Sequence, residues 1–269
     1  MLSIFLYSRV MKELLTFFTL IILSLTSLHA NVYSYRKYSH VKDFYSNITA
    51  DVVEVCKKYK LPPAAVLAIA GLESGYGRGY VAQITGNILS LGAFKGDKKL
   101  PGLYLPYSKS KDKVLFDPKK IKMHKKNDLV WKKRPESYKR DYRPAPYVGT
   151  IKNLELLKYN SNLMKKAHED CLNDFATRWI VKKSNIKAFA NTRIWLDKLI
   201  AKNKNTNILF NLRVNKEFIN RIGGHPKSFN NRAAWPKKAK AVMKNVGLIA
   251  LLANIEYKKM NFNKAWSSQ

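Results

Sequence analysis

One carboxyl group stands out among the eighteen acidic residues because of its neighbours. Glu73 follows an almost wholly apolar run at residues 64–72 and precedes a Gly-Tyr-Gly turn at residues 75–77. The apolar run predicts a buried helix, and glycine commonly ends a helix, so we expect Glu73 in the last helical turn. Burial disfavours the ionised carboxyl group, and the negative end of the helix dipole acts in the same direction. The setting therefore predicts a raised pKa at Glu73.

A carboxylic acid that keeps its proton near neutral pH can donate that proton to a glycosidic leaving oxygen. The glycines at positions 75 and 77 leave room for a polymer beside the acid, and Tyr76 offers a ring that can pack on a sugar face. The alternative is a solvated glutamate at a helix end. The apolar helix and the Gly-aromatic-Gly turn favour the general acid.

The stretch Leu-Glu-Ser-Gly-Tyr-Gly at residues 72–77 resembles the Glu-Ser-Gly-aromatic-Gly signature of glycoside hydrolase family 73. This family holds the glucosaminidase domains of bacterial autolysins, the flagellar peptidoglycan hydrolase and the Bax-type proteins. Three weaker similarities follow in order, so that the resemblance covers roughly residues 50–200. They are residues 87–92 against Asn-Leu-Phe-Gly, residues 145–154 against Pro-Tyr-Glu-Ser entering a helix, and residues 190–195 against Ala-Thr-Asp-Pro-x-Tyr.

The resemblance implies a mainly α, lysozyme-like helical domain with a small β-hairpin lobe. It implies an endo-β-N-acetylglucosaminidase that cleaves the β-1,4 bond after N-acetylglucosamine in peptidoglycan, with Glu73 as the general acid. The substrate-binding residues expected beside it are Tyr76, Asn87, Tyr147 and Tyr142.

The chain also departs from the family pattern. Phe189 stands where the late motif has a tyrosine, and Thr-Arg at residues 192–193 replaces its Asp-Pro. The phenol of that motif tyrosine is then either absent from the cleft or supplied by Tyr142 or Tyr147. Residues 148–150 lack the usual Glu-Ser, and Tyr147 suits a core position at a helix entry nearly as well as a cleft.

Hydrolysis by two carboxyl groups needs a partner for Glu73, about 5 Å away for a nucleophile or roughly 6.5–9.5 Å away for a base that activates water. The family resemblance places this partner in the β-lobe. Asp117 and Asp112 flank a short apolar stretch at residues 114–116, and we favour Asp117. Each also suits an ordinary surface acid, and a substrate-assisted route would need no strong base. The other acids of this segment are Asp97, Asp128, Glu136 and Asp141.

The elements that must position these groups are mostly helical. Apolar residues at three- and four-residue steps predict helices over residues 41–60, 64–74, 163–179, 191–200 and 241–257. Residues 92–146 are rich in proline, glycine and lysine, and short extended pieces at 102–106 and 114–116 predict a β-hairpin. We expect a signal peptide at 1–30, a glucosaminidase-like domain at 31–205 and a C-terminal helical extension of unassigned role at 206–269.

The amino terminus and the charge balance indicate an exported protein. A start at Met11-Lys12, an apolar run at 14–25 and Ala30 predict a secretory signal cleaved after Ala30; the alternative is an uncleaved anchor. Fifty Lys and Arg face eighteen Asp and Glu, a net charge of +32 that attracts polyanions. The polyanions present in the periplasm or cell envelope are peptidoglycan glycan strands, anionic envelope polymers and lipid surfaces. We therefore expect a partner of this kind and no nucleic acid partner.

The two cysteines, Cys56 and Cys171, suit a disulfide or two buried thiols equally, and they form no metal-ligand pattern. His124 and His225 are expected to be surface groups rather than ligands, so we expect neither a metal nor a cofactor. Two other functions stay open. A lytic transglycosylase-like muramidase shares the Glu-Ser at a helix end, although its Gly-Leu-Met-Gln segment is absent here. The other is a non-catalytic basic envelope-binding protein, which would need no second carboxylate.

Overall fold

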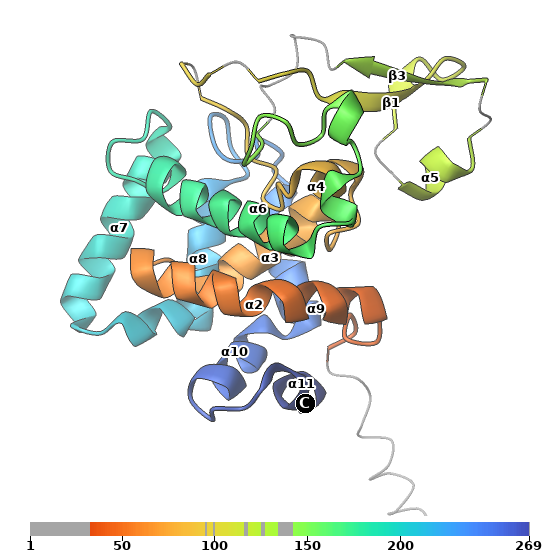
Figure 1. Cartoon of the computed structure of the whole chain (residues 1–269). Helices are drawn as coiled ribbons and strands as arrows, with labels where there is room; N and C mark the ends of the chain where they lie inside the picture. The colour runs from red at the N-terminus through yellow and green to blue at the C-terminus, as the bar shows by residue number, and fades with distance from the viewer. Residues whose placement is uncertain are drawn as a thin grey trace, which may run out of the picture.

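Figure 1 shows the computed structural model, which describes residues 33–94, 96–98, 100–115, 118–124, 127–133 and 142–268. Most of the described chain is helical, and one small antiparallel sheet accompanies the helices. The predicted mainly α class is thereby confirmed. The predicted signal peptide, Asp117, Glu136 and Asp141 lie outside the described residues.

Helix α3 (Pro63–Ser74) is central because it is apolar all round. Every residue of it from Pro63 to Gly71 is buried. Helices α2 (Ser39–Tyr59), α8 (Leu212–Ile222), α9 (Trp235–Val246) and α10 (Leu248–Glu256) all pack against it. Both α2 and α3 begin and end within two residues of the bounds expected from the sequence.

The remaining helices surround this centre. Helix α4 (Tyr80–Thr85) follows the glycine turn, and α6 (Ser161–Asp174) continues into the π-helical turn η3 (Phe175–Trp179). Figure 1 shows α7 at the edge of the molecule, beside α8. The other elements are α7 (Lys187–Asn203), α11 (Phe262–Ser267), and the 3₁₀ turns η1 (Ile151–Asn153), η2 (Leu156–Lys158) and η4 (Thr206–Phe210).

The sheet lobe consists of β1 (Tyr104–Ser108), β2 (Lys113–Val114) and β3 (Leu129–Lys133), with the short helix α5 (Pro118–Lys122) beside them. The strand order is β2-β1-β3, and Tyr107 pairs with both Val114 and Val130. The predicted hairpin is present with shifted strand bounds. The third strand was missed because its apolar part is only the triplet at residues 129–131, which stands among lysine runs.

The helix predicted over residues 241–257 is wrong as a single element. Gly247 ends α9 with φ +70° and starts α10, so the chain turns between them. A β-carbon at this position would lie 2.5 Å from the Tyr33 ring. Glycine is therefore required both for the left-handed backbone and for the close approach of the amino-terminal segment.

Residues on both sides of the predicted domain boundary at 205/206 belong to one hydrophobic core. That core contains residues from Val41 in α2 to Trp266 in α11. Arg36 joins the two ends of the described chain, because its guanidinium donates to backbone oxygens of Val246, Ala265 and Ser268 at 2.8, 3.3 and 3.0 Å. The helices after residue 205 thus complete the fold around α3.

Cys56 and Cys171 are both buried free thiols, which decides between the two alternatives left open above. Burial raises the pKa of the Cys171 thiol to about 12, so it is protonated at neutral pH. Within the described part of the chain, no helix combines the length and the apolar character that a membrane crossing requires.

Candidate functional site at the end of helix α3

Glu73 lies in the last turn of α3, as expected from the sequence. The turn that follows is fixed by Ser74, whose hydroxyl donates to the Ala70 carbonyl at 2.6 Å and accepts from the Gly77 N–H at 2.8 Å. Gly75 has φ +56°, a left-handed conformation that favours glycine and closes the helix. The backbone that carries Glu73 is therefore held on both sides.

The carboxyl group of Glu73 is partly buried and has a specific partner. The indole N–H of Trp235, the first residue of α9, donates to Oε1 of Glu73 at 2.6 Å. Burial raises the pKa of Glu73, while the Trp235 hydrogen bond and the charge of Arg232 lower it by less. The predicted direction of the shift is confirmed, with burial as its main cause.

This arrangement divides the two carboxyl oxygens into different roles. Because an N–H group can only donate, Oε1 must accept from Trp235 in both protonation states. In a neutral Glu73 this hydrogen bond favours the proton on Oε2, because a carbonyl oxygen accepts better than a hydroxyl oxygen does. An acid with one oxygen fixed and the other holding the proton is suited to directional proton donation.

Trp235 is itself held rigidly. It is 3% exposed, and a β-carbon on Gly223 would lie 2.3 Å from its ring, so the glycine permits this contact. The Phe229 ring lies 5.4 Å from Trp235 and also contacts Phe175, Trp179 and Phe189. These rings form an aromatic wall that fixes the indole N–H opposite Glu73.

Tyr76, expected to pack on a sugar, lies in a different aromatic group. It has φ +56°, and its ring contacts Tyr35, Phe44 and Tyr45 edge-on at 6.1 to 6.2 Å. These partners come from the amino-terminal segment and α2. The contacts give Tyr76 a packing role, with part of its side chain still exposed.

Asn87, a second expected substrate contact, is buried and closes its own loop. Its amide nitrogen donates to the Leu91 carbonyl at 2.9 Å, and its amide oxygen accepts from the Leu91 N–H at 2.8 Å. The Cys171 thiol also lies 3.5 Å from that oxygen. The structure therefore gives Asn87 a loop-holding role.

The two tyrosines offered as substitutes for the missing phenol differ in burial. Tyr142 is buried in the main core, where burial and nearby acidic groups raise its pKa. Tyr147 is 48% exposed in a turn and is the better placed of the two for contact with a ligand. The alternative core position for Tyr147 is thus wrong.

The described candidates for a second carboxylate have partners of their own. Asp112 sits in the β1–β2 turn with φ +48° and accepts from the Tyr107 hydroxyl. Asp97 pairs with Arg178 at 2.6 Å, which fastens the loop after residue 94 to η3. Asp117 lies outside the described residues and stays a prediction.

Asp128, His124 and Ser108 form a Ser-His-Asp group whose geometry is not that of a catalytic triad. Asp128 accepts from Ser108 and Ser110, and these hydrogen bonds hold its pKa well below the usual range. His124 places the same nitrogen, Nε2, against both Ser108 Oγ at 2.9 Å and Asp128 at 2.5 Å. A nucleophilic triad needs the two ring nitrogens to contact different partners. This group therefore fixes the sheet lobe.

Sequence reasoning missed Trp235 and Arg232, which lie in the segment that was left unassigned. Trp-Pro at residues 235–236 is a signal for a helix start, because proline is favoured in a first turn. Nothing local links it to Glu73, 162 positions earlier. Among the residues the structure describes, no cluster of three or more His, Cys, Asp or Glu could hold a metal ion.

Comparison of the chain with protein-family models, with curated proteins and with solved structures gives no match.

Proposed function

We propose that this chain is an exported peptidoglycan hydrolase of lysozyme-like architecture that cleaves the β-1,4 bond after N-acetylglucosamine. The observation that carries the proposal is the Glu73 carboxyl group, partly buried at the end of an apolar helix and held through one oxygen by Trp235. The resemblance of residues 72–77 to the family 73 signature supports the same role.

In the proposed reaction Glu73 donates the proton on Oε2 to the glycosidic oxygen as the bond to the sugar breaks. The raised pKa keeps the proton available, and the Trp235 N–H and the Arg232 charge stabilise the carboxylate that forms. As that bond breaks, the anomeric carbon is attacked by a carboxylate, by a water that a carboxylate activates, or by the N-acetyl oxygen of the substrate, and Asp117 stays the candidate for the carboxylate. Where a bond to the carboxylate or to the N-acetyl oxygen forms first, water then breaks it while Glu73 accepts a proton from the water. Tyr147 is proposed to contact the glycan.

The charge of the chain supports an envelope substrate. A net charge of +32 draws the protein to anionic polymers such as peptidoglycan with its peptide carboxylates, or to a lipid surface. Because this attraction acts between exposed charges, salt weakens it. Binding to purified wall fragments should therefore decrease as the salt concentration rises.

Product analysis tests the proposal. Purified protein is incubated with peptidoglycan, and the soluble fragments are identified by mass spectrometry. A reducing-end N-acetylglucosamine supports the proposed bond specificity. An anhydromuramic end would contradict it in favour of a lytic transglycosylase.

The second candidate is a non-catalytic envelope-binding protein. The packing role of Tyr76 and the loop-holding role of Asn87 favour it, because two expected substrate contacts are used within the fold. Wall binding without any soluble fragment would support this second function and refute the first.

A further inference from the structure

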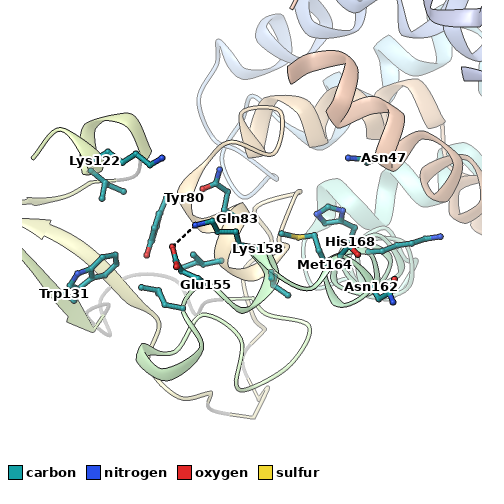
Figure 2. A pocket seen from close by; sticks show the side chains of 16 residues that line it. Asn47, Tyr80, Gln83, Lys122, Trp131, Glu155, Lys158, Asn162, Met164 and His168 are labelled. Carbon is teal, nitrogen blue, oxygen red and sulfur yellow. Dashed lines mark hydrogen bonds and ion pairs between the residues drawn. The ribbon is translucent and has the colours of Figure 1, made fainter. Parts of the chain in front are cut away.

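A cavity of about 1190 Å³ lies between the sheet lobe and the helices α4 and α6. Sites for small molecules typically measure roughly 300–1,000 Å³, so the space is sufficient for such a ligand. Figure 2 shows Tyr80, Trp131 and Lys122 at one end and Asn47, Met164 and His168 at the other. Glu73 and Trp235 are not among the lining residues, so the cavity is separate from the candidate acid.

The cavity walls belong to two small apolar clusters that are distinct from the main core. Tyr80, Ile84 and Leu154 pack in a cluster with Leu103 and Leu105 of the lobe. On the other side, Leu157 and Met164 pack with Val148 and Ala167. The space between the clusters is therefore apolar on two sides, and a ligand with an aliphatic body would bury both walls.

The Tyr80 hydroxyl is an unpaired donor in this wall. The side chain is 8% exposed, and within the described part of the chain its hydroxyl has no hydrogen-bond partner. Burial and the nearby Glu155 carboxylate raise the pKa of Tyr80, so the phenol keeps its proton. An unsatisfied buried donor is unfavourable, and a ligand oxygen that accepts from it would remove this cost.

Charge at the same end favours an anion. Glu155 pairs there with Lys158 at 3.4 Å. Lys122 is exposed at the cavity and makes no ion pair with another described residue. Among the described lining residues, it is therefore the lysine that has no ion-pair partner and is available to a ligand.

At the opposite end Lys165 is paired with Asp51 and Glu169, each at 3.7 Å. Burial lowers the pKa of His168 to about 4, so its imidazole is uncharged at neutral pH. Its neighbours along the lining are Asn47 and the thioether of Met164. Among the described lining residues, this end therefore presents no unpaired charge to an aliphatic chain.

We infer that the cavity binds a small amphipathic anion, a molecule with one carboxylate and an aliphatic body. The carboxylate lies at the Lys122 end, where it accepts from the Tyr80 hydroxyl, and the chain extends toward Leu157 and Met164. The site is independent of Glu73 and of the proposed hydrolysis.

Isothermal titration calorimetry with hexanoate, octanoate and decanoate tests the inference on the full protein, below micelle-forming concentrations. Each added CH₂ is worth up to about 0.8 kcal/mol, so affinity should rise by up to about fourfold per CH₂. Octanoate should bind more tightly than octan-1-ol and than octyltrimethylammonium. Affinity that does not depend on chain length, or equal affinity for the cation, would overturn the inference.

Variants locate the ligand. Tyr80→Phe should weaken octanoate binding by about 13- to 160-fold, the range of one hydrogen bond to a charged group. Lys122→Met should reduce the affinity for octanoate toward that for octan-1-ol, whereas the matched control Lys198→Met on α7 should leave it unchanged. Glu73→Gln should bind octanoate as the wild type does, and loss of binding there would place the ligand at the wrong site.

Met164→Glu places a charge at the aliphatic end and should abolish binding while the melting temperature reports folding. If this variant does not fold, Tyr80→Phe and Lys122→Met still decide, because both substitutions act at the cavity surface. Unchanged octanoate affinity in both would refute the assignment.

Discussion

The hydrogen bond between Trp235 and Glu73 makes a quantitative prediction about the pH dependence of activity. Trp235→Phe removes the N–H donor and keeps an aromatic ring against the Phe229 wall. The lost bond stabilises the ionised carboxyl group more than the neutral one. The substitution should therefore raise the pKa of Glu73 further above its usual range.

The size of this shift follows from the two protonation states. A hydrogen bond to a charged group contributes about 1.5–3 kcal/mol, and one to a neutral group contributes about 0.5–1.5 kcal/mol. The difference of about 1–1.5 kcal/mol corresponds to about one pKa unit. Since a general acid must be protonated, the alkaline limb of kcat/KM should move up by about one pH unit.

The assay is the rate of clearing of peptidoglycan suspensions as a function of pH, with Trp195→Phe on α7 as the matched control. Trp195 contacts Arg221 and not Glu73, so its replacement should leave the limb in place. An alkaline limb that stays fixed or moves down in Trp235→Phe would refute the assignment of the limb to Glu73.

Three further predictions concern the stability of the fold. Because burial raises the pKa of Glu73 in the folded state, ionisation of Glu73 lowers the stability of the fold as the pH rises through that pKa. Glu73→Gln should therefore melt at a higher temperature than the wild type at neutral pH. The difference in melting temperature should vanish below the pKa that Glu73 has in the unfolded chain. Arg36→Ala removes the guanidinium that bridges to Val246 and Ser268 and should lower the free energy of unfolding by about 2–4 kcal/mol in urea titrations, whereas exposed Lys37→Ala should change it by less than about 0.5 kcal/mol. Gly247→Ala combines φ +70° with a contact to Tyr33 and should cost about 1–3 kcal/mol, and a variant as stable as the wild type would contradict the requirement for glycine there.

The helices that could be predicted are those whose signals are local. Helix α2 has a regular apolar face, and α3 is apolar throughout and opens on Pro63, so both were placed closely. The break at Gly247 was missed because the apolar pattern continues across it. The glycine itself permits the left-handed turn, and the contact with Tyr33, far away in sequence, adds a second reason for it.

In the candidate site, too, the features with a local cause could be predicted from the sequence and those that depend on packing could not. The raised pKa of Glu73 was predictable because its cause, the apolar helix, adjoins it in sequence. The Trp235 partner was not, because it depends on how α9 packs against α3. Asn87 was expected to bind substrate because its motif does not distinguish an amide that faces a ligand from one that closes a loop.

The most direct test of the central claim is the initial rate of peptidoglycan cleavage by the wild type and by Glu73→Gln. General acid catalysis contributes typically about 10²–10⁴-fold, so the variant should lose activity by that factor while staying folded. A folded Glu73→Gln variant that cleaves peptidoglycan as fast as the wild type would contradict the role of Glu73 as the general acid.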